Sequence, residues 1–472
     1  MTAPDRTSKA TELLLAIDRA AAEPIGRQVE NQLRDRIREG GLRPGTPLPS
    51  TRDLARQLGV SRGITVSAYA QLGAEGYLVL RQGARPRVSE VVTAPAPGTE
   101  PDSATERPRF DFRPSLPEVS TFPRRAWLRS VRAAIEAMSD SDLGYGDPRG
   151  VEALRTMLAE YLGRVRGVVA EPARTVITSG YTQAEGLVCR ALAGSGAKRI
   201  ALENPSDPEQ RETAARAGLE VVPIGVDVEG LRVDELKRRN VDAVILGPAH
   251  QFPTGAVLSG LRRTELLAWL RDSEAIAIED DYDAEYRYDR APVGALQGLE
   301  PERVIYAGSA SKTLAPTLRL GWLVLPAKLV DAVTREKHLA DRGTARIEQF
   351  AYADFVGRGE LDRHLRRMRT QYRARRDRLV EALAKALPET SVQGVAAGLH
   401  VTVALPAGDD ERAIVAEAAR RGIAVEAMGD YRAASKGDQP TLLIGYGQSP
   451  EPAIGPGVKA LADAIKEARK RS

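Results

Sequence analysis

The stretch Ala307-Gly-Ser-Ala-Ser-Lys-Thr-Leu-Ala-Pro-Thr-Leu-Arg-Leu-Gly-Trp322 places one lysine between two short apolar runs. Both runs have the composition of buried strands, so Lys312 is expected to be largely removed from water. Burial of an unpaired lysine is costly, and a desolvated lysine amine is the nucleophile of Schiff-base chemistry. Ser309 can offer a hydroxyl group to a phosphate, and Arg319 can offer a bidentate guanidinium. We therefore treat this stretch as a candidate cofactor site.

Outward from this stretch, strand-like runs alternate with helical ones, such as 183–193 and 261–271. That alternation predicts a mostly parallel sheet covered by helices on both faces, an α/β fold. Beyond Pro326, long charged helices and two more strand-like runs predict a smaller α+β part. The strands predicted for the sheet are 175–178, 199–202, 220–223, 243–246, 275–278, 304–306 and 320–325. The smaller part should hold helices 327–336, 347–356 and 361–387 and strands 400–404 and 442–444.

Polar residues follow several of these strands, at the edge of the sheet where ligands gather in such folds. Thr178-Ser-Gly-Tyr-Thr opens a helix, whose first amides can hold a phosphate. Glu279-Asp-Asp-Tyr-Asp places carboxylates at the end of another strand. A phosphate cup, an acid and a Schiff-base lysine are together what pyridoxal phosphate needs, because the acid keeps its pyridine nitrogen protonated.

The first ninety residues have a different pattern, that of a helix-turn-helix followed by a two-stranded wing. Residues 11–22 suggest a short amphipathic element, and 25–39 carry one apolar stripe. Ser50 is expected to cap a helix over 51–58 that stops at Gly59. Ser61 is expected to cap the next helix, which runs to about residue 74. The wing strands are predicted at 77–83 and 85–89.

A charge excess marks the same region as a partner for a polyanion. Residues 24–90 hold eleven arginines, no lysine and six acidic residues, a net charge of +5 (11 − 6), against +4 for the whole chain. A recognition helix reads the major groove of DNA with its N-terminal residues, and nearby arginines hold phosphates. The predicted DNA contacts lie at helix starts, in the connector and in the wing: Arg43, Arg52, Ser61, Arg62, Thr65, Arg81 and Arg85.

A proline-rich stretch without large apolar residues after its start, 91–108, is typical of a linker. We therefore expect a DNA-binding domain at 11–90 and a cofactor domain at 109–472. The larger part of the cofactor domain should span about 145–325, and the smaller part about 326–472.

The first domain resembles the GntR-type winged helix in Arg43-Pro-Gly, Leu48-Pro-Ser and Val60-Ser-Arg, among other residues. Residues 110–472 resemble a fold type I, aspartate-aminotransferase-like domain that binds pyridoxal phosphate. Joined in this order, they resemble the MocR family of bacterial transcription regulators.

This resemblance implies a role for each matching residue. Lys312 would hold the cofactor as a Schiff base, Asp280 would pair with the pyridine nitrogen, and Tyr282 would bind the ring hydroxyl. Gln251 or Phe252 would lie beside that hydroxyl. Tyr145 would reach the phosphate of a partner subunit, which implies a homodimer. The phosphate would be held by Ser309, Arg319 and the amides of Tyr181 and Thr182.

Two departures from the family favour a sensor over an enzyme. Asp207 stands where an aromatic ring usually stacks on the cofactor, and no arginine precedes Leu442 to clamp a substrate carboxylate, although Arg432 is near in sequence. We expect a regulator whose effector is pyridoxal phosphate itself or an amino compound, as in vitamin B6 or amino-acid metabolism. The alternatives are an active aminotransferase with a DNA-binding module and a scaffold that has lost the cofactor.

Composition narrows the remaining choices. One cysteine, Cys189, excludes an intrachain disulfide, four scattered histidines offer no metal site, and no apolar run could span a bilayer. We expect a cytoplasmic protein. His250 is expected to make a structural hydrogen bond. Asp281, Asp283, Glu285 and Arg287 are expected to form a solvated turn, and a solvated helix face is expected at Arg363, Arg366, Arg367, Arg369, Arg373, Arg375 and Arg376.

Overall fold

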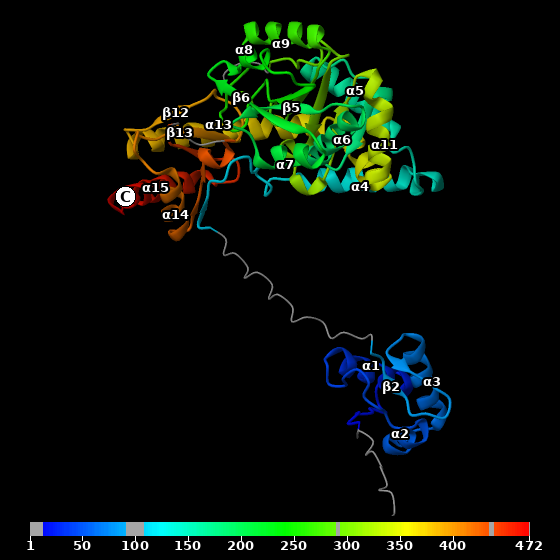
Figure 1. Ribbon diagram of the computed structural model, residues 1–472. Helices are drawn as coiled ribbons and strands as arrows, with labels where there is room; N and C mark the ends of the chain where they lie inside the picture. Colours follow the sequence, from blue (N-terminus) through cyan, green and yellow to red (C-terminus); the bar gives the residue numbers. More distant parts are fainter. Residues whose placement is uncertain (1–12, 91–107, 289–292, 434–438, 472) are drawn as a thin grey trace, which may run out of the picture. The chain divides into compact units, whose positions relative to one another are not determined.

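The computed structural model describes residues 13–90, 108–288, 293–433 and 439–471 (Figure 1). The chain forms two compact units, residues 1–106 and 107–472. Residues 91–107 of the predicted linker lie outside the described residues. The two units are described separately below.

The first unit is a three-helix bundle with a short wing. Its core is formed by apolar side chains that recur at helical spacing, including Val29, Leu33 and Ile37. The second helix begins at Ser50, whose Oγ accepts a hydrogen bond from the Asp53 amide (3.2 Å), and ends at Gly59 in the left-handed region (φ 62°). The elements are α1 (Ile25–Arg38), α2 (Thr51–Leu58), α3 (Arg62–Ala74), β1 (Leu78–Val79) and β2 (Arg87–Val88).

Two local predictions for this unit need comment. The described part of the predicted amphipathic element, residues 13–22, has no regular secondary structure, and it places Leu13 in the core with Leu15 and Ile17 packed against that core. Ser61 precedes α3, but its side chain makes no capping hydrogen bond; its backbone carbonyl accepts from the Ile64 amide instead. The wing is also shorter than predicted, because only Leu78–Val79 and Arg87–Val88 pair as strands.

The second unit is built on a sheet of eight strands in the order β4-β11-β10-β9-β8-β5-β6-β7. The neighbouring pairs from β10 to β6 are parallel, whereas β11 and β7 run antiparallel to their neighbours. The mostly parallel sheet is thus confirmed. Its strands are β4 (Thr175–Thr178), β5 (Arg199–Asn204), β6 (Glu220–Asp227), β7 (Gly230–Leu231), β8 (Ala243–Leu246), β9 (Ile276–Asp281), β10 (Val304–Ser309) and β11 (Gly321–Val324).

Helices cover both faces of this sheet because successive strand residues point to opposite sides. Ile200 and Leu202 pack with α6 (Tyr181–Gly194), α7 (Pro208–Arg216) and α11 (Val330–Asp341), whereas Ala201 packs with α8 (Val233–Leu236) and α9 (Gly260–Ser273). Figure 1 shows α9 and α7 on opposite sides of β5 and β6. The long apolar runs of the sequence follow from this double coverage.

Strands β5, β6, β9 and β10 all continue beyond their predicted ends. Most of the extra residues of β5, β9 and β10 are polar or glycine, as in Glu279-Asp280-Asp281 and Gly308-Ser309, and they lie at the carboxyl edge of the sheet. The polar residues that interrupt the apolar pattern are therefore part of the strands.

A second, antiparallel sheet forms the smaller part, with strand order β12-β13-β16-β15. Helices α13, α14 and α15 pack with it in one core. The pair β3 and β14 joins residues just after the linker to this part. The elements are α13 (Glu360–Ala386), α14 (Glu411–Arg420), α15 (Glu451–Arg471), β3 (Phe110–Asp111), β12 (Ser391–Gln393), β13 (His400–Ala404), β14 (Ile423–Ala424), β15 (Glu426–Ala427) and β16 (Thr441–Gly445).

The division between the larger and smaller parts differs from the prediction at both ends. Helix α11 packs against α6, and α12 (Arg346–Gly357) packs against α4 (Arg124–Ala137) and α5 (Glu152–Arg166), so both belong with the larger part. The remaining short helices are η1 (Asp140–Leu143), η2 (Pro172–Arg174), α10 (Ala310–Thr313), η3 (Pro316–Leu318), η4 (Ala327–Leu329) and η5 (Met428–Tyr431). Among the described helices, none is both long and apolar enough to cross a membrane.

Candidate functional site

A cavity of about 380 Å³ opens at the carboxyl edge of the large sheet. Its lining comes from strand ends, from the start of α6 and from the smaller part, so segments far apart in the sequence meet there. Seven of the eight residues predicted to bind the cofactor line this cavity: Tyr181, Thr182, Asp280, Tyr282, Ser309, Lys312 and Arg319. The eighth, Tyr145, does not.

Lys312 lies in the single helical turn α10, directly after β10. Burial lowers the pKa of its amine, and the carboxylates of Asp283, Asp280 and Asp207 act in the opposite direction. A lysine with a lowered pKa is more often in the neutral form that can attack a carbonyl carbon. The environment expected from the sequence is thus present around this side chain.

Asp280 faces the cavity because it alternates with its neighbours along β9. Glu279 points the other way, where its two oxygens accept the amides of Leu296 and Gln297 (both 3.0 Å). Oδ1 of Asp280 is buried and has no hydrogen-bond partner within the described residues. Burial, followed by the nearby carboxylates of Asp281 and Asp283, raises the pKa of Asp280. A buried carboxylate of this kind fits a protonated ring nitrogen, which would supply the missing partner.

Another part of the cavity is suited to an anion. It is formed by Ser309, Arg319 and the start of α6. The helix begins after Gly180, which has a left-handed φ of 107° that favours glycine. A Cβ on Gly321 of β11 would lie 2.9 Å from the Cα of Gly180, so this packing requires glycine there. The positive end of the 14-residue helix and the Arg319 guanidinium thus line one cavity, an arrangement that fits a phosphate group.

Tyr282 connects the cavity to a buried polar cluster. Its hydroxyl lies 3.0 Å from His250 Nδ1, and that nitrogen lies 3.0 Å from both oxygens of Asp283. The rings of His250 and His400 pack with their centroids 5.6 Å apart. His250 does not line the cavity, and its contacts fit the structural role expected for it.

The structure separates Gln251 from Phe252, which the sequence left as alternatives. Phe252 lines the cavity. Gln251 is buried beside it, where Nε2 donates to the carbonyl of Pro205 (2.8 Å) and Oε1 accepts from the Thr254 amide (3.0 Å). The glutamine therefore braces two loops, and only the phenylalanine can touch a bound ligand.

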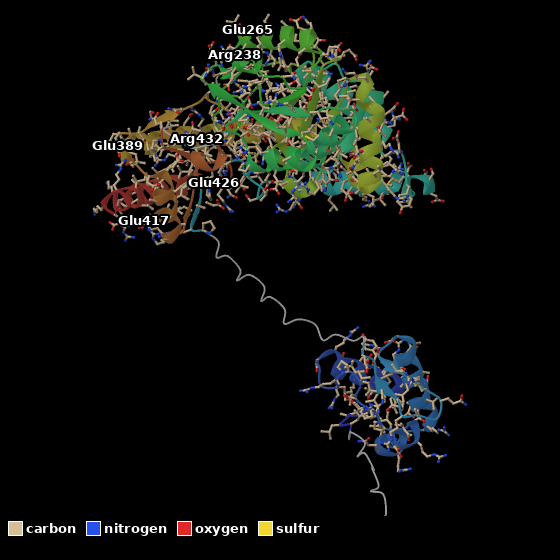
Figure 2. The ribbon with its side chains drawn as sticks, viewed as in Figure 1. Arg238, Glu265, Glu389, Glu417, Glu426 and Arg432 are labelled. Carbon is tan, nitrogen blue, oxygen red and sulfur yellow. The ribbon has the colours of Figure 1, made fainter. Side chains whose placement is uncertain are left out.

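The two departures from the family have different structural outcomes. Asp207 lines the cavity, and its Oδ1 caps α7 by accepting the Glu209 amide (2.9 Å). Arg432 lines a different cavity, and Nη2 donates to the Gln439 carbonyl (3.2 Å). It therefore does not replace the absent arginine clamp. Glu426, also in the smaller part and labelled with Arg432 in Figure 2, lines the cavity.

The predicted solvated turn after β9 is wrong. Asp281 is buried in an ion pair with Arg166 (2.7 Å) and accepts a hydrogen bond from the Tyr306 hydroxyl (2.7 Å). Asp283 and Arg287 are also buried, and Glu285 is half-buried. Asp281 lies inside because β9 continues through it, which the loss of apolar residues conceals, and the other three follow the strand in bends and turns that are themselves covered.

The arginines of α13 form a solvated face only in part. Arg363, Arg366, Arg367 and Arg373 are exposed, and Arg369 and Arg376 are half-buried. Arg375 is buried, and its Nη2 forms an ion pair with Glu118 (2.7 Å). It follows Leu361, Met368 and Tyr372 along the buried stripe, so its position on the helix decides its environment.

Tyr145 lies on a separate surface depression and is 89% exposed. The guanidinium of Arg342 lies 5.7 Å from the centroid of its ring. Its predicted role, contact with the phosphate site of a partner subunit, requires a second chain and stays a prediction.

The predicted DNA contacts of the first unit are exposed, with one exception. Exposed side chains at helix starts, in the connector and in the wing are Arg43, Arg52, Ser61, Arg62, Arg81 and Arg85. Thr65 is fully buried, and its hydroxyl bonds the carbonyls of Thr51 (2.8 Å) and Arg62 (3.0 Å). Its prediction as a DNA contact is therefore wrong, because the residue faces α2. Val66 and Ser67 are exposed instead.

We expect Thr65→Val to loosen the helix-turn-helix without weakening its contact with DNA. Loss of a hydroxyl that bonds two carbonyls costs about 1 kcal/mol. Amide hydrogen exchange of α3 in the full chain should then be about fivefold faster, because 1.4 kcal/mol corresponds to a factor of ten. DNA affinity at fixed salt should stay within about twofold. A tenfold loss of affinity with unchanged exchange would place Thr65 at the DNA.

Comparisons with known proteins agree with both units. Residues 25–88 match the model of the bacterial regulatory proteins of the gntR family, and residues 120–435 match aminotransferase class I and II. The probable rhizopine catabolism regulatory protein MocR of Rhizobium meliloti is 33% identical over 79% of each chain. The chain belongs to the MocR-type regulators.

Two further relatives cover nearly the whole chain. The uncharacterized HTH-type regulator YhdI of Bacillus subtilis is 33% identical over 95% of this chain and 97% of its own. The pyridoxine biosynthesis regulator PdxR of Corynebacterium glutamicum is 30% identical over 96% and 99%. Among solved structures, a kynurenine aminotransferase of Pyrococcus horikoshii has a TM-score of 0.69 and 28% identity, over 76% of this chain and 91% of that one. The MocR-type architecture is therefore shared along nearly the whole sequence.

Proposed function

We propose that the second unit of this MocR-type regulator binds pyridoxal phosphate, and that the state of its cavity alters how the winged helix binds promoter DNA. The observation that carries this is the unpartnered oxygen of Asp280 in the cavity that also holds Lys312 and Arg319. Lys312 would bind the aldehyde carbon, Asp280 the ring nitrogen and Tyr282 the ring hydroxyl. When bound, this cofactor supplies an electron sink and a carbonyl carbon that reacts with amines.

A sensor is favoured over an enzyme by the lining of the cavity. Arg319 is the only arginine among the described lining residues, and its place beside α6 suits a phosphate. Without a second guanidinium, an amino-acid carboxylate lacks the clamp that orients it for catalysis. We therefore propose negligible transfer of amino groups between amino acids and keto acids. Steady turnover with any pair from a standard panel would favour the aminotransferase alternative.

The signal in this proposal is pyridoxal phosphate itself or an amino compound that enters the same cavity. The name of PdxR, which refers to pyridoxine biosynthesis, supports the first, and that of MocR, which refers to rhizopine catabolism, supports a small effector. We further propose that the protein works in the cytoplasm as a homodimer, with Tyr145 reaching the partner's site and two winged helices on two half-sites.

The test is the affinity of the full-length protein for DNA upstream of its own gene, with and without pyridoxal phosphate. Salt must be held constant, because phosphate contacts make such affinities steeply salt-dependent. A change of affinity or footprint on addition of the cofactor is the expected result. Equal binding in both states, with the cofactor demonstrably bound, would reduce it to a fixed part of the fold.

Arg62→Ala should weaken DNA binding at every salt concentration. Arg62 is exposed at the first position of α3, where a recognition helix meets the groove. Loss of one phosphate contact reduces the slope of log K against log salt by about 0.9, and loss of a base contact costs about 1–3 kcal/mol for its preferred sequence. Arg132→Ala removes another exposed positive charge, from α4, and should change neither quantity.

A further inference from the structure

The cavity holds an unusual excess of carboxyl groups. Six of its described lining residues are acidic, and two, Lys312 and Arg319, are basic. Asp280 is accounted for by the proposed ring nitrogen, and Glu203 accepts the Gly247 amide (3.0 Å). The other four, which we call the acidic wall, have no role toward the proposed cofactor: Glu185, Asp207, Glu209 and Glu426.

Glu185 is the member of this wall that points most directly to a missing ligand. It lies on α6, one turn after Tyr181, and is only 3% exposed. Its Oε1 is buried and has no hydrogen-bond partner among the described residues. Burial, followed by the charges of Asp280, Asp207 and Glu209, raises the pKa of Glu185 to about 9. An isolated buried carboxyl is costly, and a bound cation would relieve that cost.

Glu426 reaches the same cavity from the smaller part. Its strand β15 is followed by Tyr431, whose hydroxyl donates to Oε2 of Glu426. The carbonyl of Tyr431 accepts hydrogen bonds from Arg211 (2.8 Å) and from the Ser206 amide (3.0 Å), which hold this segment against the start of α7. Burial raises the pKa of Glu426, and the charges of Asp430 and Asp207 add to the effect. All four members of the acidic wall line the same cavity, so one ligand there can meet several of them.

An anionic group does not suit the acidic wall, since each added negative charge would face four acidic side chains. A metal ion is also disfavoured, because no group of three or more His, Cys, Asp or Glu side chains within the described ranges is arranged to hold one. An organic cation remains, whose size lets separate carboxylates share its charge and donors.

On the basis of the proposed function, we propose that the effector is an amine with a second positive charge and no carboxylate, of the 1,4-diaminobutane class. One amine would lie toward Lys312 and the cofactor site, and the other would be bound by the acidic wall. The absence of an arginine clamp is consistent with this effector class, because the cavity offers carboxyl groups instead of a second guanidinium to the far end of the effector.

The test compares three probes of similar length on the full-length protein loaded with pyridoxal phosphate. Isothermal titration calorimetry should show 1,4-diaminobutane binding at least tenfold more tightly than butylamine, which lacks the second charge. 4-Aminobutyrate, which replaces that charge with a carboxylate, should be weaker still. Equal or tighter binding of 4-aminobutyrate would overturn the proposal, and so would absence of diamine binding.

Two isosteric variants locate the second charge. Glu426→Gln and Glu185→Gln should each weaken diamine binding about tenfold or more, as expected for loss of a charge-assisted hydrogen bond, and leave butylamine binding within twofold. Tryptophan fluorescence of each variant checks its fold, and the probe series on the natural protein needs neither variant. Unchanged diamine affinity in both folded variants would overturn the acidic wall as the binding group.

These measurements distinguish failure of the effector proposal from failure of the proposed function. If pyridoxal phosphate shifts DNA affinity and the diamine does not bind, the regulator stands and this effector class is wrong. If the protein takes up no pyridoxal phosphate, the proposed function fails, and diamine binding is then measured on the cofactor-free protein. In that case the effector proposal is overturned separately if the cofactor-free protein binds the diamine less than tenfold more tightly than butylamine.

Discussion

Asp281→Ala should lower the free energy of unfolding of the second unit, residues 107–472, by about 3–5 kcal/mol. Asp281 and Arg166 lie 2.7 Å apart with side-chain exposures of 2% and 1%, so the substitution leaves a guanidinium buried without its counter-charge. Among the described residues, the Arg166 guanidinium would keep its hydrogen bond to the Val293 carbonyl (2.7 Å), and the Tyr306 hydroxyl would lose its acceptor. Removal of one partner of a buried pair is far more costly than loss of the pair's net contribution.

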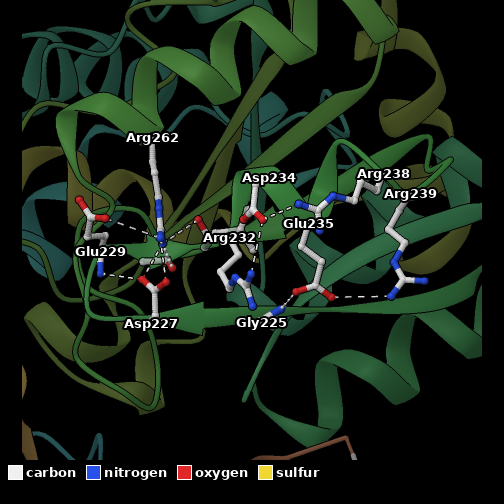
Figure 3. Close-up of polar contacts among 11 residues, drawn as sticks. Gly225, Asp227, Glu229, Arg232, Asp234, Glu235, Arg238, Arg239 and Arg262 are labelled. Carbon is white, nitrogen blue, oxygen red and sulfur yellow. Dashed lines mark hydrogen bonds and ion pairs between the residues drawn. The ribbon is translucent and has the colours of Figure 1, made fainter.

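Urea unfolding followed by tryptophan fluorescence measures this change selectively. The three tryptophans, Trp127, Trp269 and Trp322, all lie in the larger unit, so the signal is free of the winged helix. Asp234→Ala is the matched control, because Asp234 pairs at the surface with Arg232 (3.4 Å) and Arg238 (3.0 Å), as Figure 3 shows. Exposed pairs contribute about 0–1 kcal/mol. Equal losses in the two variants would mean that the Arg166 pair is hydrated.

The fold could be predicted because its pattern is repeated many times along the chain. Most buried strands of the large sheet are apolar runs, several of them followed by a helix, as β4 is by α6 and β5 by α7, and both faces of the sheet are covered, so the same signal recurs along the chain. The ends of the strands could not be predicted in the same way. At Glu279-Asp280-Asp281 the chain stays extended while its side chains become charged, and only the alternation of β9 shows which acid faces Arg166 and which faces the cavity.

The site was predicted where a short motif carries it and missed where the fold brings distant segments together. Lys312, Ser309 and Arg319 lie within eleven residues of sequence, and their spacing already suggests a common role. Glu426 and Tyr431 reach the cavity from more than a hundred residues away, through a segment with no motif of its own. Thr65 shows the converse error. It precedes Ala68 and Leu72 by three and seven positions, a helical spacing that places it in the core rather than at the DNA.

Lys312→Ala should abolish retention of pyridoxal phosphate during gel filtration and weaken its binding at least about 100-fold, which corresponds to about 2.7 kcal/mol. The variant keeps Asp280, Ser309, Arg319 and the start of α6, so a weak, reversible site for the phosphate and ring should persist. What it loses is the amine that can bond to the aldehyde carbon. Borohydride treatment followed by mass spectrometry should add the reduced cofactor to the natural protein and not to the variant.

The same variant tests whether the covalent bond is part of the signal. The cofactor-free variant should bind promoter DNA as the cofactor-free natural protein does, because Lys312 lies in the other unit from the helix-turn-helix. Its affinity should then fail to respond to pyridoxal phosphate at concentrations that saturate the natural protein. Lys328→Ala, at an exposed position in η4, should respond normally. An unchanged DNA response in Lys312→Ala would show that the cofactor acts without its bond to the lysine, through the phosphate cup and Asp280 alone.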